Sequence, residues 1–237
     1  MDGNYNDIID IILTLISDES ISKSIAVSGS IVPYIITNKE SDEYHSDFYV
    51  LVKEKKMEEV RSKLKKLSKE YQFDIISDSK KNAGADYGFK IKYENTIAGF
   101  FPYSLLDGDL TIKTYSHDKE NKKIILKKKI IPKVSKSSVI RLINFGKDNQ
   151  LRIMSPEFIL ADKETREKQP GNPTKETMYL LDKICDESVL KVVRQSFGNA
   201  RVTMLSKKVR EDNLLLTIVL AILFIILLLM AYICFKK

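Results

Sequence analysis

The stretch AVSGSIVPYIITNKESDEYHSDFYVLV, residues 26–52, decides how the first part of the chain is interpreted. It opens with a short apolar run that ends at Gly29 and Ser30, followed by residues that favour a short helix over 31–37. A polar loop then leads to Asp47, which opens a second β-rich run, so that another strand is predicted over 47–53. Gly29 and Ser30 can be explained as a tight turn between the strand and the helix.

The remaining patterns predict an α+β fold. Residues 1–136 alternate between amphipathic helices and β-rich runs, which indicates a mixed sheet flanked by helices. The expected elements are helices over 5–17 and 54–71, a strand over 73–76, and two hairpins, 88–93 with 96–103 and 110–115 with 122–131.

From about residue 137 the pattern becomes helical, and we expect a helical region over 137–212. Ser155, Pro156 and Glu157 predict a helix start, since they supply an N-cap, a proline at the first helical position and an acid in the first turn. That helix is expected to reach Lys168, and further helices follow over 174–185 and after Asp186.

The Gly-Ser turn followed by Asp47 resembles the nucleotidyltransferase superfamily of the polymerase-β type. Members carry Gly-Ser at the end of a first strand, an acid-x-acid pair on the next strand and a third carboxylate on a later strand. The resemblance implies a nucleotidyltransferase-like sheet, a nucleoside triphosphate as ligand or substrate, and Mg²⁺ held by carboxylates. It assigns Gly29 and Ser30 to phosphate binding, and Asp47 to metal binding and catalysis.

The segment MSPEFILADKETREK, residues 154–168, adds to the resemblance. It is similar to the helix behind the catalytic domain in a bacterial branch of the superfamily, where the pattern is roughly Pro-Glu, then Lys-Glu and Arg-x-Lys, and where the resemblance implies that basic residues could reach phosphate. Lys163, Arg166 and Lys168 match that pattern, although a solvated basic helix face explains the same residues.

The chain departs from the family at two of three carboxylates. Tyr49 stands where the second acid belongs, and a neutral phenol is a poor Mg²⁺ ligand. The strand over 96–103 contains no acid, and we place the missing third carboxylate near Gly99. Substitutes could come only from loop acids, which are Asp42, Glu43, Asp107 and Asp109.

Three functions follow from these departures. The leading hypothesis is a non-catalytic or weakly active protein that binds a nucleotide or another phosphorylated ligand. The first alternative is an active metal-dependent transferase acting on a small molecule or protein. The second is an interaction module with a vestigial site, which docks on lipid or on a protein partner.

Residues 213–235 are expected to form a membrane anchor. The run from Leu214 is apolar and uncharged, and about 22 helical residues span about 33 Å, which suffices for a bilayer core. Basic residues are more numerous before this run than after it, which predicts that residues 1–213 face the cytoplasm. The chain is therefore expected to be a single-pass, tail-anchored protein of the cell membrane.

The composition narrows the partners further. The net charge is +7 and is dominated by lysine, which suits anionic lipid head groups better than sequence-specific reading of nucleic acid. Lys127, Lys128 and Lys129 lie on the second hairpin, where they either contact lipid or keep a solvated sheet edge soluble. The only two cysteines, Cys185 and Cys234, cannot build a disulfide framework or a zinc site.

Overall fold

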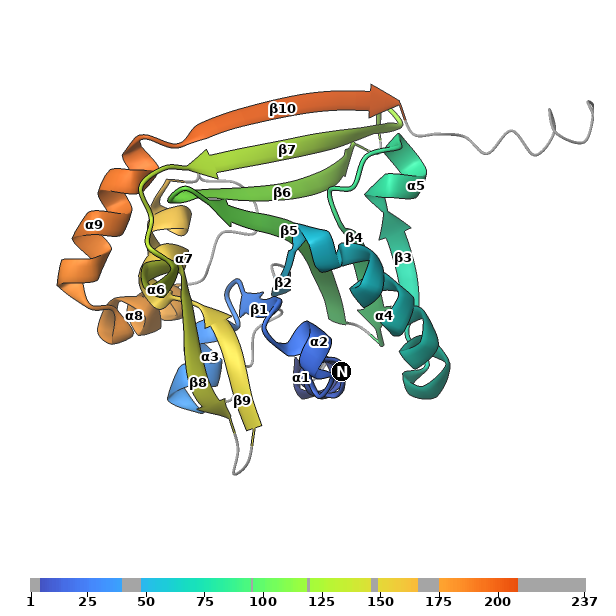
Figure 1. Ribbon diagram of the computed structural model, residues 1–237, viewed down its shortest axis with the longest axis horizontal. Coiled ribbons are helices and arrows are strands. Elements are labelled where there is room, and N and C mark those ends of the chain that lie inside the picture. Colours follow the sequence, from blue (N-terminus) through green and yellow to red (C-terminus); the bar gives the residue numbers. More distant parts are fainter. Residues whose placement is uncertain are drawn as a thin grey trace, which may run out of the picture.

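The computed structural model describes residues 5–39, 48–94, 96–118, 120–145, 149–165 and 175–208. In these ranges the chain forms an α+β fold, in which helices pack on a ten-stranded mixed sheet (Figure 1). Several residues named above lie outside the described ranges, namely Asp42, Glu43, Asp47, Arg166, Lys168 and the segment 213–235.

The helices of the described residues are α1 (Tyr5–Ile16), α2 (Glu19–Ser22), α3 (Val32–Thr37), α4 (Met57–Tyr71), α5 (Ser79–Ala83), α6 (Lys136–Val139), α7 (Pro156–Glu164), α8 (Lys175–Ile184) and α9 (Glu187–Gly198). A short 3₁₀ turn, Glu54–Lys56, precedes α4. None of these helices is both long and apolar enough to cross a bilayer.

The strands are β1 (Ile25–Ser28), β2 (Phe48–Lys53), β3 (Asp74–Asp78), β4 (Phe89–Tyr93), β5 (Thr96–Leu106), β6 (Asp109–Asp118), β7 (Lys123–Ile131), β8 (Ile140–Phe145), β9 (Asn149–Met154) and β10 (Arg201–Lys208). Their main order is β10-β7-β6-β5-β2-β1-β9-β8, and β4 joins the free edge of β5 and carries β3.

The centre of the sheet is the parallel pair β2 and β5. Phe48 to Lys53 run beside Ala98 to Tyr103 in continuous register. β1 pairs antiparallel with the other edge of β2, and β9 joins β1 in parallel. Because parallel strands need both faces covered, helices are expected on each side of this centre.

One side of this centre is covered by α1 and α4. The buried face of α1 includes Ile8, Ile12 and Leu15, and α4 contributes Val60 and Leu64. These helices pack against β5 and β2, whereas α7, α8 and α9 gather as a separate group (Figure 1).

Most sequence expectations for residues 5–131 are confirmed. The hairpins appear as β4 with β5 and β6 with β7, and α3, α4 and β3 lie where they were expected. The N-cap prediction also holds, since the Ser155 hydroxyl accepts a hydrogen bond from the Phe158 N–H at 3.2 Å.

The expectation of an all-helical chain after residue 137 is wrong. Strands β8 and β9 form an antiparallel pair within it, and β9 extends the sheet beside β1. After α9 the chain forms β10, which pairs with β7 along eight residues. The hairpin β6–β7 is consequently not a sheet edge, because β10 satisfies the outer hydrogen bonds of β7.

A buried arginine connects α4 to the β3–β4 connection. The side chain of Arg61 is 3% exposed, and its Nε lies 3.1 Å from Asp78 Oδ2. Its Nη2 lies 2.9 Å from Asp86 Oδ1, and the guanidinium stacks over the Phe89 ring at 5.0 Å. Removing one partner of a buried ion pair is costly because the remaining charge stays desolvated.

We therefore expect Arg61→Met to lower the free energy of unfolding by about 3 kcal/mol. Urea unfolding followed by circular dichroism measures the change. The control is Arg194→Met, because Arg194 pairs with Glu164 through two hydrogen bonds but is exposed, and such pairs contribute less than about 1 kcal/mol. Equal losses in the two variants would contradict a structural role for the Arg61 cluster.

Candidate functional site

The turn after β1 has the backbone that the sequence predicted. Gly29 has φ of 94°, in the left-handed region that glycine adopts without strain. The start of α3 is less favourable for an anion than expected, since Pro33 in its first turn has no N–H. Ser30 is buried at 5% exposure.

A row of four residues crosses the sheet beside this turn. Ser28 is the cross-strand partner of Tyr49, and Tyr49 is the partner of Gly99. Gly99 is in turn the partner of Lys90 on β4. Directly opposed residues project from the same face, which we call the site face. The row contains a hydroxyl, a phenol and an ammonium group, but no carboxylate.

The space above Gly99 is filled by Phe101. A Cβ atom placed on Gly99 would lie 2.4 Å from Cε2 of that ring. The same ring meets Tyr49 edge-to-face, with centroids 5.2 Å apart and an interplanar angle of 82°. Phe101 is 2% exposed. A side chain at position 99 is therefore excluded unless Phe101 moves.

Lys90 brings positive charge to the row. Burial lowers the pKa of its ammonium group, and its Nζ lies 5.5 Å from the centroid of the Tyr115 ring. A cation over an aromatic face is attracted by the ring quadrupole. Burial also raises the pKa of Tyr115, which therefore stays neutral.

Helix α7 covers the cavity beside the Gly29 turn. Its Ile159, Asp162 and Lys163, together with Met154, face Ser28, Gly29 and Tyr49 across a cavity of about 20 Å³. Lys163 is only 7% exposed. The cavity holds about one water molecule, so a nucleotide would enter only after α7 has moved from the sheet.

The structure thus brings Gly29 and Lys163 to one cavity. It also removes two candidate substitutes, because Asp107 and Asp109 flank the far end of β5. The seven steps from Gly99 to Leu106 span about 23 Å at strand spacing, which puts both acids out of reach. Among the described residues, no group of acids, histidines and cysteines could hold a metal ion.

Two residues of the site face were missed from the sequence. Lys90 alternates with apolar neighbours in β4, a pattern typical of any half-buried strand. Phe101 belongs to the core, but its position over Gly99 depends on the backbone of β5. Neither residue carries a local signal that would identify it without the cross-strand register.

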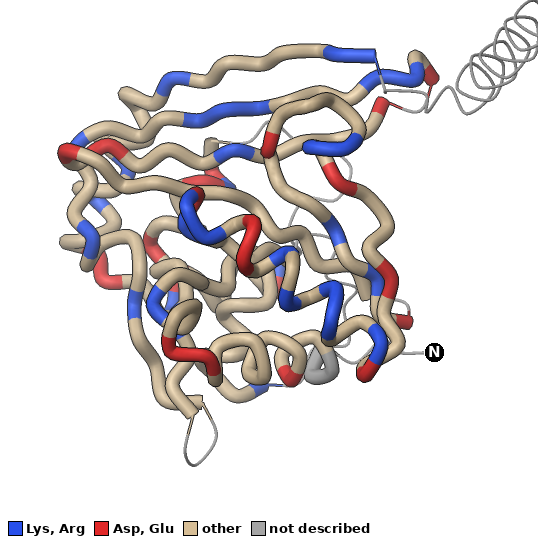
Figure 2. Tube along the Cα trace, turned by 45° about the vertical axis from the view of Figure 1, so that its right-hand side comes forward, with Lys and Arg blue, Asp and Glu red and all other residues tan. Residues whose placement is uncertain are grey.

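Lys127, Lys128 and Lys129 of β7 do not all project from one face of the sheet. Successive side chains of a strand point to opposite faces, so Lys128 is directed away from Lys127 and Lys129. Lys129 Nζ lies 2.7 Å from Asp162 Oδ1 and 4.4 Å from the centroid of the Phe197 ring. Figure 2 shows basic segments along β7 and β10.

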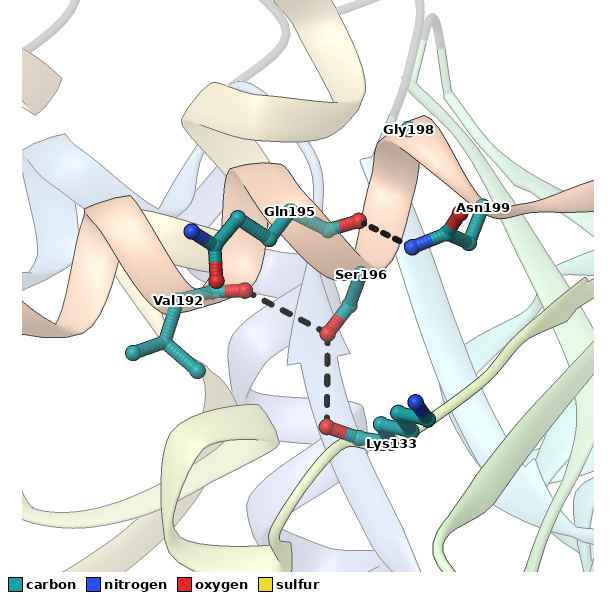
Figure 3. A pocket seen from close by; sticks show the side chains of 6 residues that line it. All are labelled: Lys133, Val192, Gln195, Ser196, Gly198 and Asn199. Atoms are coloured by element: carbon teal, nitrogen blue, oxygen red, sulfur yellow. Dashed lines mark hydrogen bonds between the residues drawn. The ribbon is translucent and has the colours of Figure 1, made fainter.

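A second hollow, of about 560 Å³, lies near the end of α9 (Figure 3). The Ser196 hydroxyl lies 3.3 Å from both the Lys133 and the Val192 carbonyl oxygens. The Asn199 amide donates to the Gln195 carbonyl at 3.0 Å. These polar groups bond one another, and the hollow shares no lining residue with the cavity at Gly29.

Comparison with known proteins adds little to this geometry. No protein-family model and no curated protein matches the sequence. Among solved structures, the chain is similar to the antibiotic-resistance factor ANT(2'')-Ia, with a TM-score of 0.48 and 14% sequence identity. The match covers 81% of this chain and 89% of that chain. A likeness of this size carries no argument about function.

The contact between Gly99 and Phe101 makes a prediction about coupling. Gly99→Ala should destabilise the protein by about 1–3 kcal/mol, because overpacking forces the buried ring to move. In a Phe101→Leu background the same change should cost less, and urea unfolding of the four-member cycle measures the difference.

Gly198→Ala is the control for this cycle, since a Cβ there meets no atom within 4 Å. Gly198→Ala should lower the free energy of unfolding only slightly in either background. Additive losses for Gly99→Ala and Phe101→Leu would show that the ring does not block position 99.

Proposed function

We propose that this chain is a nucleotidyltransferase-like protein that binds a phosphorylated ligand and transfers nucleotidyl groups weakly or not at all. The fold part of the proposal is supported by the order of the central strands. β1 ends in the Gly-Ser turn, and β2 and β5 are the parallel neighbours on which the family places its carboxylates.

The cross-strand row carries the functional part. The positions expected for the second and third carboxylates, Tyr49 and Gly99, are direct partners in the sheet. Two-metal chemistry needs clustered carboxylates to hold ions about 3.5–4 Å apart. The described residues do not fit such a pair of Mg²⁺ ions, since the row offers a phenol and an ammonium group instead.

Two lysines near this row suit an anionic ligand. Lys163 reaches the cavity beside Gly29, and Lys90 adds a second positive charge along the row. In metal-dependent members the ions would neutralise the phosphates of the ligand. Here fixed lysines supply charge of that sign, so binding should not require a divalent cation.

The expected test result is a thermal shift that nucleoside triphosphates produce equally in Mg²⁺ and in EDTA. A ligand at ten times its Kd stabilises the folded state by about 1.4 kcal/mol. Lys163→Met should abolish the shift because it removes the cation at the cavity, whereas Lys191→Met, on an exposed position of α9, should leave it unchanged.

The alternatives are separate outcomes of that titration. Absence of a shift with every nucleotide sinks the ligand-binding proposal. A shift that requires Mg²⁺, together with label transfer that Asp47→Ala abolishes, would establish the active transferase instead.

We also propose that the protein works at the cytoplasmic surface of the cell membrane, anchored by residues 213–235. The apolar length of that segment supports an anchor. Lys207 and Lys208 at the end of β10 add positive charge five residues or more before it, as expected of the cytoplasmic side.

Alkaline carbonate extraction of membranes tests the anchor. The full chain should stay in the pellet because its apolar segment is embedded in lipid. A variant that ends at residue 212 keeps the basic residues of β10 but lacks the apolar segment, so carbonate should release it from the membrane. Release of the full chain by carbonate would refute a transmembrane anchor.

A further inference from the structure

A cluster of three cations lies on the sheet away from the cavity at Gly29. Lys53 ends β2, Arg152 belongs to β9 and Lys136 begins α6. The pKa of Lys53 is lowered by burial and by the positive charges of Lys136 and Arg152. Residues from three separate elements therefore bring like charges within electrostatic reach of one another.

The register places Lys53 of this cluster on the site face. Tyr49, Leu51 and Lys53 alternate along β2, so all three project from the same side. Lys53 is the cross-strand partner of Tyr103. Burial raises the pKa of the Tyr103 phenol, and the positive charge of Arg152 acts in the opposite direction. Lys53 and Tyr103 are therefore neighbours on the site face.

Within the part of the chain that the structure describes, these three cations form no ion pair, unlike three of the arginines. Arg61, Arg141 and Arg194 each contact a carboxylate. Among the described residues, by contrast, no acid forms an ion pair with Lys53, Lys136 or Arg152, and the Nε atom of Arg152 is buried without a hydrogen-bond partner. A buried donor without a partner costs free energy in the unliganded protein.

We propose that Lys53, Lys136 and Arg152 form an anion site for the phosphate group of a soluble small molecule. The phosphate oxygens would accept hydrogen bonds from the Lys53 and Lys136 ammonium groups and from the guanidinium of Arg152, and the charge of the group would relieve the repulsion between the cations. The site stands apart from the cavity at Gly29, because the four steps along β2 from Tyr49 to Lys53 span about 13 Å.

Isothermal titration of the full chain in a nonionic detergent tests the site. Inorganic phosphate is titrated against a chloride background of matched ionic strength, and glycerol 3-phosphate is titrated in parallel to tell free phosphate from a monoester. Lys53→Met and Arg152→Met should each weaken binding about tenfold, since each removes a charged hydrogen-bond donor. Lys66→Met, on exposed α4 surface, is the matched control.

The Lys163→Met background separates this site from the one at Gly29. Phosphate binding that persists there and is lost with Lys53→Met supports the cluster, even if nucleotides never bind. Binding that is unchanged by both Lys53→Met and Arg152→Met overturns the proposal.

Thermal unfolding without phosphate gives an independent readout. Lys53→Met should raise the midpoint or leave it unchanged, because it removes repulsion between like charges. A clearly lowered midpoint would mean that Lys53 has a favourable partner in the free protein, and it would count against an open anion site.

Discussion

The parallel pairing of β2 with β5 is the constraint on which the other features depend. Its register makes Tyr49 and Gly99 neighbours, and the outer edges of the two strands then position β1 and β4. A slip of one residue would reverse the direction of every side chain on β2. Phe48, Val50 and Val52 fill the apolar interior, so such a slip is strongly disfavoured.

Charge separates the proposed anion-binding face from a metal centre. Carboxylates that face one another are tolerated when cations bind between them, whereas the described row of Ser28, Tyr49, Gly99 and Lys90 contains none. Lys53, Lys90 and Lys163 add positive charge to the same side of the sheet. Such charge would favour the anionic ligands proposed above.

Local sequence signals predicted the local parts of the fold. The Ser155 cap, the Gly29 turn and both hairpins depend on residues close in the chain, and they were found where expected. Strands β8, β9 and β10 were not. β9 and β10 pair with β1 and β7, which lie far away in the sequence, whereas the pairing of β8 with β9 was missed although Gly146 follows β8. Arg152 carries no local sign of its role, which depends on an unpaired Nε within the folded sheet.

The packing of Phe101 over Gly99 also restricts how the chain can change. A carboxylate at position 99 would meet the ring of Phe101, and a carboxylate at position 49 would lose the edge-to-face contact with that ring. Loss of the aromatic ring alone would open a cavity in a buried region. A carboxylate at either position therefore lowers stability before any ion can bind, so the packing of Phe101 limits which residues positions 49 and 99 can accept.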